Sequence, residues 1–365
     1  MTSALFKSLS LRGLQLTNRI VIAPMCQYSA VDGNANDWHL IHLGHLALSG
    51  AGLLMVEATG VEMRGRITRE CLGLYSDENE RALGRVLQAV RRHSGIRIGV
   101  QLGHAGRKAS RLKPTDGRAE VPMGQGNWRV IGPSAVAFGD GWQEPREMDA
   151  GDIRSVTASF VQATQRCARL GVDLIELHGA HGYLLSSFLS PIANRRRDAY
   201  GGSLENRMRF PLEVFEAVRG AWPHDKPLGV RFNATDWDER GFTPDEAVVF
   251  ARELRDLGCD FVELSSGSNS AVTPPLAPGY QVPFSARVRR EAGIPTIAVG
   301  LIRDPRHAHA IVAEGQADLV ALARGILDNP RWPWHAARLL GEKVEQPYQY
   351  ARAVAQERYP LREAA

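Results

Sequence analysis

Eight short apolar segments, each followed by a helical pattern of apolar residues, recur along most of this chain. They begin near Arg19, Leu53, Arg97, Leu174, Leu228, Phe261, Pro295 and Leu319. Alternating strands and helices favour a parallel sheet, and eight such units are the number that closes a (β/α)8 barrel. We therefore predict an α/β fold, a TIM barrel whose eight strands all run in the same direction.

Helix start and stop signals flank these segments. Thr243 is followed by Pro244 and, three residues past the threonine, by Glu246, the pattern of a capping box with a proline at the first helical position. Further candidate caps are Ser203 and Asp304, and candidate helix stops just before strands are Gly171 and Gly258. These signals support the division into alternating strands and helices.

We expect a single domain over residues 1–341. A chain of 365 residues, 44% of them hydrophobic, can form one large core, and no linker or low-complexity segment interrupts it. Residues 5–18 are typical of a small hairpin that serves as a lid. Residues 342–365 contain too few apolar residues for a core of their own, and we expect a C-terminal tail there.

Three connections in the strand and helix pattern are too long for simple turns. They cover residues 106–149, 182–203 and 266–282. Each follows the carboxyl end of a predicted strand, the face on which barrel enzymes place their active sites. We therefore expect long βα loops that form the walls of a pocket.

Charge and cysteine spacing narrow the class of protein. The net charge is +4, with 44 Lys and Arg against 40 Asp and Glu, and the basic cluster at residues 195–197 is too short for a nucleic-acid surface. No Cys-x-x-Cys occurs, which favours reduced thiols over a zinc or iron–sulfur site, at Cys26, Cys71, Cys167 and Cys259. No signal peptide or apolar run of membrane length is evident, so we expect a cytoplasmic protein with no membrane partner.

Residues 174–183 bring proton-handling groups to one strand end. The segment reads LIELHGAHGY, an apolar strand that runs into His178, His181 and Tyr183. Imidazoles can donate to a substrate oxygen, and a phenol is a weak acid suited to delivering one proton. Two structural histidines or a metal-binding pair would show the same spacing. The position at a strand end favours a reaction site.

Polar groups at other predicted strand ends indicate a bound cofactor. Arg231 lies within an apolar strand, where a buried guanidinium needs an anion or a strong acceptor, although a core glutamate would also satisfy it. Gly300, Ala323 and Arg324 follow the last two strands, where small residues and a fixed charge suit a phosphate, although turn residues would look alike. Together with Gln101, these positions favour a flat, phosphorylated cofactor over the barrel mouth.

Two other patterns limit the alternatives. No Gly-x-Gly-x-x-Gly follows a predicted strand, so a nicotinamide nucleotide would have to bind transiently at the same mouth. His39, His42 and His45 have helical spacing on one face, and we expect hydrogen bonds between helices rather than a metal site.

Three glutamates occupy matching places in alternate predicted strands. Because alternate strands fill common layers of such a barrel, Glu57, Glu176 and Glu263 are expected to form a buried polar layer. Side chains two apart share a face of a strand, so Glu176 should lie one layer below His178.

Five motifs together resemble the Old Yellow Enzyme family of flavin-dependent ene-reductases, most closely the subclass that contains xenobiotic reductase A. They lie at residues 23–28 (APMCQY), 56–59 (VEAT), 101–107 (QLGHAGR), 178–185 (HGAHGYLL) and 198–207 (DAYGGSLENR). The resemblance extends over almost the whole chain. Cys26, where other members have threonine, and His181, where many have asparagine, both point to this subclass.

The resemblance implies FMN, held without a covalent bond. Its phosphate would lie on Gly300, Ala323 and Arg324, and its ring would be surrounded by Pro24, Met25, Cys26, Ala58, Gln101 and Arg231. NADPH, or NADH, would reduce the flavin and leave. An activated alkene would then bind with its carbonyl oxygen on His178 and His181, near Cys26 and Tyr28, and take a proton from Tyr183.

The resemblance also implies a homodimer. Residues 346–352 (QPYQYAR) resemble a tail that reaches a neighbour's substrate pocket, a role that would fall to Arg352, with Tyr350 as a companion. Two other functions are open from the sequence: a metal-dependent barrel hydrolase that uses His178 and His181, and a non-catalytic barrel that binds a phosphorylated ligand.

Overall fold

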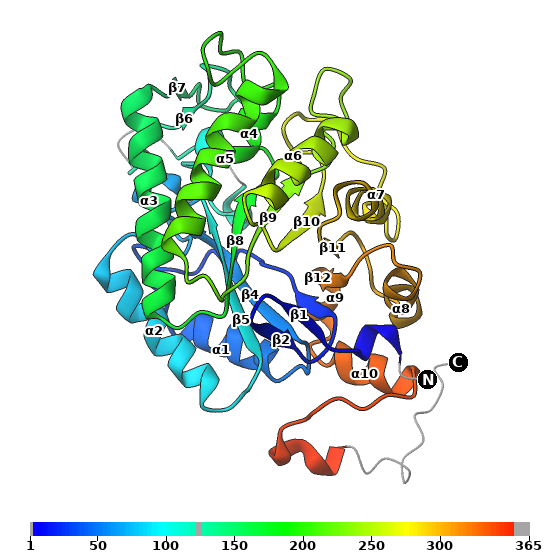
Figure 1. Ribbon diagram of the computed structural model, residues 1–365. Coiled ribbons are helices and arrows are strands. Elements are labelled where there is room, and N and C mark those ends of the chain that lie inside the picture. The colour runs from blue at the N-terminus through cyan, green and yellow to red at the C-terminus, as the bar shows by residue number, and fades with distance from the viewer. Residues whose placement is uncertain (1–2, 118, 122–125, 354–365) are drawn as a thin grey trace.

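The structure, a computed structural model, describes residues 3–117, 119–121 and 126–353. Eight parallel strands close into a barrel surrounded by helices (Figure 1), as the sequence predicts. In barrel order the strands are β3 (Ile20–Ile22), β4 (Leu53–Gly60), β5 (Arg97–Gly103), β8 (Leu174–Gly179), β9 (Leu228–Asn233), β10 (Phe261–Ser265), β11 (Thr296–Ala298) and β12 (Leu319–Leu322).

Three of the helices that follow these strands begin at the predicted caps. Thr243 and Glu246 form the capping box, Ser203 accepts from the amide of Asn206, and Asp304 from that of Arg306. The helices are α1 (Asp37–Ala47), α2 (Asp77–Arg91), α3 (Ala150–Arg169), α5 (Leu204–Ala221), α6 (Pro244–Asp256), α7 (Val282–Ala292), α8 (Pro305–Ala313), α9 (Arg324–Asp328) and α10 (Trp332–Leu339). Gly171 and Gly258 have φ of 68° and 89°, the left-handed backbone that ends α3 and α6.

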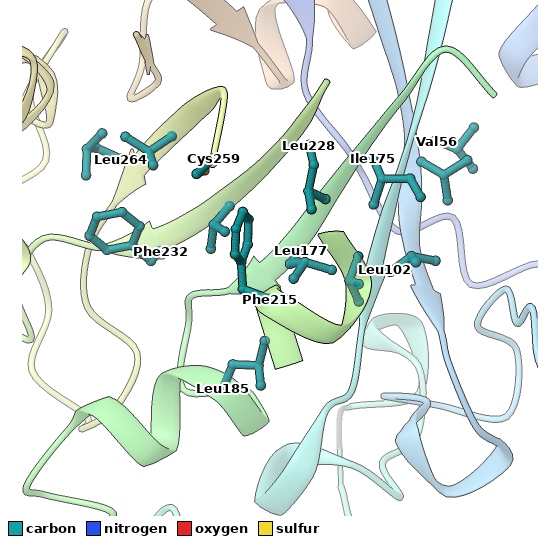
Figure 2. Packing of buried hydrophobic residues seen from close by; sticks show 14 of the residues in the cluster. Val56, Leu102, Ile175, Leu177, Leu185, Phe215, Leu228, Phe232, Cys259 and Leu264 are labelled. Carbon is teal, nitrogen blue, oxygen red and sulfur yellow. The ribbon is translucent and has the colours of Figure 1, made fainter. Parts of the chain in front are cut away.

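The largest apolar cluster lies between the barrel strands and the helices. Side chains such as Val56, Ile175 and Phe232 leave the strands on this side, and Phe215 of α5 belongs to the same cluster (Figure 2). Their neighbours along the strands face the barrel interior because side chains alternate along a strand. Truncating a buried phenylalanine in such a layer typically costs about 3–5 kcal/mol.

The predicted hairpin closes one end of the barrel. It consists of β1 (Leu9–Leu11) and β2 (Leu14–Leu16), whose leucines pack in one cluster with the strand residues Val21, Leu53 and Leu319. These residues lie at or near the amino ends of their strands. The hairpin therefore covers the end of the barrel opposite the strand carboxyl ends.

A buried polar network ties the long loops together at the other end. Arg107 donates to the carbonyl oxygen of Asn269 at 2.6 Å, and the Asn269 amide donates to Asp236 at 2.7 Å. Asp236 also accepts from Ser190 at 2.6 Å. Burial lowers the pKa of Arg107 to about 10 and raises that of Asp236. The loops that surround the barrel mouth are thus fixed to one another.

These loops contain short elements that the sequence did not predict. They are α4 (Leu184–Leu189), directly after Tyr183, and the two-residue strands β6 (Ile131–Gly132) and β7 (Arg146–Glu147). The described part of the chain has no helix that is both long and apolar enough to cross a bilayer.

Candidate active site

The end of β8 brings His178, His181 and Tyr183 together. The ring centroids of His178 lie 5.1 Å from His181 and 4.9 Å from Tyr183, and both pairs meet edge to face. The turn requires an unusual backbone: His181 has φ 60° and Gly182 φ 71°, and a Cβ on Gly182 would lie 2.1 Å from the carbonyl oxygen of Ser268. The glycine in this motif is therefore a steric necessity.

His178 is fixed as a neutral hydrogen-bond donor. Its Nδ1 accepts from the amide of Ala180 at 3.2 Å, which leaves the proton on Nε2. Burial lowers its pKa well below the usual 6.5, and the charges of Arg231 and Lys108 lower it further. A neutral imidazole at physiological pH can donate to an oxygen but is not an acid that supplies a proton to carbon.

His181 is held by three neighbours that the sequence did not reveal. Its Nε2 lies 2.7 Å from Ser265 Oγ, its amide donates to Asn233 at 3.2 Å, and its carbonyl oxygen accepts from Lys108 Nζ at 2.8 Å. Burial, together with the charge of Arg231, lowers its pKa well below 6.5. It is therefore neutral as well.

Tyr183 lies at the start of α4, beside a cation. Lys108 Nζ is 5.6 Å from the centroid of the phenol ring and also donates to the carbonyl oxygen of Ser268, at 3.1 Å. Lys108 was not predicted, because it lies in the long loop after β5 and its approach to Tyr183 depends on how that loop folds back. Lys108 therefore places a positive charge over the ring that carries the phenol.

The loop after β3 carries Pro24, Met25, Cys26 and Tyr28 to the barrel mouth. The Cys26 thiol hydrogen-bonds with Tyr28 and with the backbone of Ala58. Burial raises the pKa of this thiol well above its usual range, and the Cys71 and Glu57 charges add to the effect. Cys26 is therefore a neutral thiol rather than a thiolate.

Two predictions about this region need correction. His39 does not bond to a neighbouring helix: it completes the capping box of its own helix with Asn36, and its Nε2 lies 3.4 Å from Glu57. Glu57 is buried but accepts from the amide of Gln27 at 2.9 Å, so it supports the Cys26 loop instead of joining the other two glutamates. A register shift in β4 between Val56 and Thr59 accounts for this difference.

The other two glutamates do form a buried polar layer. Gln101 Nε2 donates to Glu176 at 2.7 Å, and Arg231 Nε lies 3.2 Å from Glu263. Both glutamates are fully buried. Gln101 and Arg231, predicted to face a cofactor ring, thus rest on an acidic layer.

A cavity of about 290 Å³ is lined by residues of the predicted phosphate site and by two other predicted site residues. Gly300, Ala323 and Arg324 line one end, and Arg231 and His181 lie along the same cavity. The sequence analysis missed several lining residues, chief among them Ser266, Tyr280, Gln281 and Arg303. Arg303 follows Gly300 closely in the sequence, so its basic side chain could have been predicted to contribute to the phosphate site.

The cavity fits a phosphorylated cofactor. Gly300 has φ 130°, and a Cβ there would lie 3.2 Å from both Gln281 Nε2 and a ring carbon of Tyr280, so the small residue keeps this end open. Arg303 and Arg324 supply positive charge for a phosphate. A second, narrow cavity is lined by Ala58, His104, His178 and Tyr183.

The predicted tail residues lie outside both cavities. Arg352 belongs to the short helix Tyr348–Ala353, whose Tyr350 ring lies 6.1 Å from Trp334 and 5.3 Å from the guanidinium of Arg331. Tyr350 and Arg352 are both exposed. Their role toward a neighbouring chain stays a prediction, and residues 354–365 of the tail lie outside the described residues.

Fold and site together define a TIM-barrel oxidoreductase with a phosphorylated ring cofactor. The profile of the NADH:flavin oxidoreductase / NADH oxidase family matches residues 4–342, and the chain belongs to this family, the Old Yellow Enzyme family. Its cofactor is FMN, and the enzyme is an FMN-dependent oxidoreductase.

Individual relatives agree with this assignment. The NADPH dehydrogenase of Geobacillus thermodenitrificans is 44% identical over 354 residues, which cover 96% of this chain and 99% of the relative. That of Clostridium acetobutylicum is 40% identical, with the same coverage. Among solved structures, morphinone reductase is 29% identical, with a TM-score of 0.77 over 95% of this chain and 92% of its own.

Proposed function

We propose that this protein is an NAD(P)H-dependent ene-reductase that reduces the C=C bond of α,β-unsaturated carbonyl compounds. The observation that carries the proposal is that two kinds of polar group, imidazole and phenol, lie together at the end of β8. Two neutral imidazoles can bind an oxygen, and a phenol beside them can supply a proton. This combination suits a substrate whose carbonyl oxygen gains negative charge while a neighbouring carbon is protonated.

When bound, FMN would supply hydride transfer, first from the nicotinamide nucleotide and then to the β carbon of the alkene. NADPH is proposed as the reductant because the relatives at 40–44% identity are named NADPH dehydrogenases. Gln101, Arg231, Ala58 and the loop at Pro24, Met25 and Cys26 would surround the ring. Gly300, Ala323, Arg303 and Arg324 would hold the phosphate.

His178 and His181 would bind the carbonyl oxygen. Their lowered pKa values keep them neutral, so their N–H groups donate without first losing a proton. A donor aimed at a developing oxyanion is typically worth about 2.7–4 kcal/mol. Tyr183 would then protonate the α carbon, with Lys108 nearby to stabilise the phenolate that remains.

The arrangement does not favour the two rival functions. A hydrolytic metal site needs three or more ligands, and within the described ranges no group of three His, Cys, Asp or Glu side chains is placed to hold a metal ion. A barrel that only binds a phosphorylated ligand gives no reason for a phenol beside two neutral imidazoles.

We also propose a homodimer in which Arg352, with Tyr350, reaches the neighbouring chain's substrate pocket. The exposure of both residues, on a helix away from the chain's own cavities, supports this role.

The absorption spectrum tests the proposal. Purified protein should show bound flavin, whose absorption bleaches on anaerobic addition of NADPH and recovers on addition of an enone such as cyclohexenone. Bleaching without recovery would contradict ene-reduction while leaving the oxidoreductase assignment intact.

A further inference from the structure

The polar layer beneath the proposed ring site lies on four consecutive strands of the barrel. Gln101 is on β5, Glu176 on β8, Arg231 on β9 and Glu263 on β10. Gln101 is the register partner of Glu176, and Arg231 is the register partner of Glu263. The two glutamates are 0% exposed, so water does not hydrate or screen their charge.

If both carboxyl groups are ionised, they can only accept hydrogen bonds, and the hydrogen bonds of this layer are then incomplete. Gln101 satisfies Glu176 Oε1 at 2.7 Å. Among the residues that the structure describes, Glu176 Oε2 and both oxygens of Glu263 accept no hydrogen bond of good geometry, although Arg231 Nε lies 3.2 Å from Glu263 Oε1. Buried polar atoms are rarely left unpaired, and a proton held within the layer would supply a donor.

A single proton between the carboxyl groups resolves this shortage. The side chains of Glu176 and Glu263 lie within hydrogen-bonding contact of each other. Two carboxylates cannot form such a bond, whereas a carboxylic acid can donate to a carboxylate. The same proton balances charge, because one carboxylate then remains opposite the one guanidinium of Arg231.

The two glutamates differ in their surroundings. Burial raises the pKa of Glu176 well above its usual range, the Glu263 charge raises it further, and the Arg231 charge opposes this rise. Burial also raises the pKa of Glu263, but the nearby Arg231 charge opposes this rise. Because Arg231 Nε lies 3.2 Å from Glu263 Oε1, this ion pair favours the negative charge on Glu263 and the proton on Glu176.

We propose that Glu176 and Glu263 share one proton and act as a positioning pair beneath the FMN ring. Glu176 fixes which end of the Gln101 amide faces the ring. Glu263, as the carboxylate, offsets the positive charge that Arg231 presents to the ring. Since the ring gains electrons on reduction, the net charge of this layer sets part of its reduction potential. The inference rests on the proposed placement of Gln101 and Arg231 at the FMN ring.

Two variants of the FMN-loaded protein separate the possible charge states by their midpoint potentials. Glu176→Gln mimics the neutral acid, keeps an acceptor for Gln101 and a donor for Glu263, and is expected to leave the potential unchanged. The double variant Glu176→Gln/Glu263→Gln removes the remaining negative charge. It should favour reduction by at least tenfold, a shift of about +30 mV for a two-electron couple.

Other outcomes overturn the pair. If Glu176→Gln alone raises the potential, both groups are ionised in the native protein; if the double variant leaves it unchanged, the layer carries no charge that the ring senses. A purely structural role would alter FMN affinity without this pattern.

Infrared spectroscopy provides a second reading that does not depend on FMN. The wild-type protein near neutral pH should show the C=O stretch of a protonated carboxyl group that is lost in Glu176→Gln. The same loss is expected in Glu263→Gln, whose remaining Glu176 should ionise beside Arg231, so either variant suffices if the other does not fold. A band unchanged in both refutes the shared proton. If the wild-type protein holds no flavin, the proposed function fails, and the infrared result still decides the pair.

Discussion

The rings of His178 and Tyr183 meet edge to face, with centroids 4.9 Å apart and planes at 86°. An oxygen bound by the imidazole therefore lies close to the phenol. This relationship separates two tasks, since His178 is held neutral by burial and Tyr183 lies beside the Lys108 cation.

Replacing Tyr183 by Phe should remove the proton donor and keep the ring. We expect flavin reduction by NADPH to survive, while reoxidation by an enone slows by about 10²–10⁴-fold, the usual contribution of a positioned acid. Stopped-flow absorption measures the two half-reactions separately. An unchanged rate of reoxidation would show that the proton comes from elsewhere.

Replacing Cys26 by Ser or Thr should leave FMN bound but shift its reduction potential. The raised pKa keeps Cys26 a neutral thiol bonded to Tyr28 and the Ala58 backbone, so its effect on the ring is a weak contact that a hydroxyl alters. Spectroelectrochemistry gives the potential. Unchanged potential and kinetics would reduce Cys26 to a packing residue.

Replacing Gly300 by Ala should weaken FMN binding by about tenfold or more. The residue would adopt φ 130°, a conformation that typically costs about 1–3 kcal/mol for other residues, and its Cβ would lie 3.2 Å from Gln281 and Tyr280. Gly220→Ala is the matched control, because no atom lies within 4 Å of its added Cβ. Fluorescence titration of apoprotein with FMN compares them, and equal affinities would argue against this phosphate site.

His42 should make the fold sensitive to acid. Burial, with the charges of His39 and His45, lowers its pKa from 6.5 to about 4. Between these values the unfolded chain binds a proton that the folded chain does not, so stability falls as pH drops below 6.5. After allowance for solvent screening, we expect the free energy of unfolding to be lower by about 1–2 kcal/mol at pH 4.5. Urea unfolding of wild type and His42→Gln at pH 7.5 and 4.5 tests this, and a pH dependence equal in both proteins would contradict it.

Mixing Tyr183→Phe with Arg352→Ala tests the proposed dimer, provided that each variant alone is impaired. If Arg352 acts in the neighbouring chain, a mixed dimer contains one site with Tyr183 and the partner chain's Arg352 both intact. Refolded mixtures should then recover ene-reductase activity. Activity no higher than the average of the separate variants would exclude a shared site.

Local pattern and motif order were sufficient for much of this protein. The eight-fold alternation of strand and helix specifies the barrel, because side chains alternate along a strand and repeat every 3.6 residues along a helix. The same alternation places Glu176 one layer below His178, and the structure confirms that Glu176 faces Gln101 inside the barrel. The same reasoning wrongly placed Glu57 in this polar layer, because a register shift in β4 changes which neighbours its side chain meets.

Tertiary structure alone decided which distant groups act on one another. Lys108 reaches His181 and Tyr183, and Ser265 reaches the His181 ring, only because the barrel closes and its loops fold over the mouth. The neutral state of the histidines and the raised pKa values of Glu176 and Glu263 likewise arise from burial. A sequence names the ionisable groups, but burial and the charges brought near them determine their protonation, and both exist only in the folded chain.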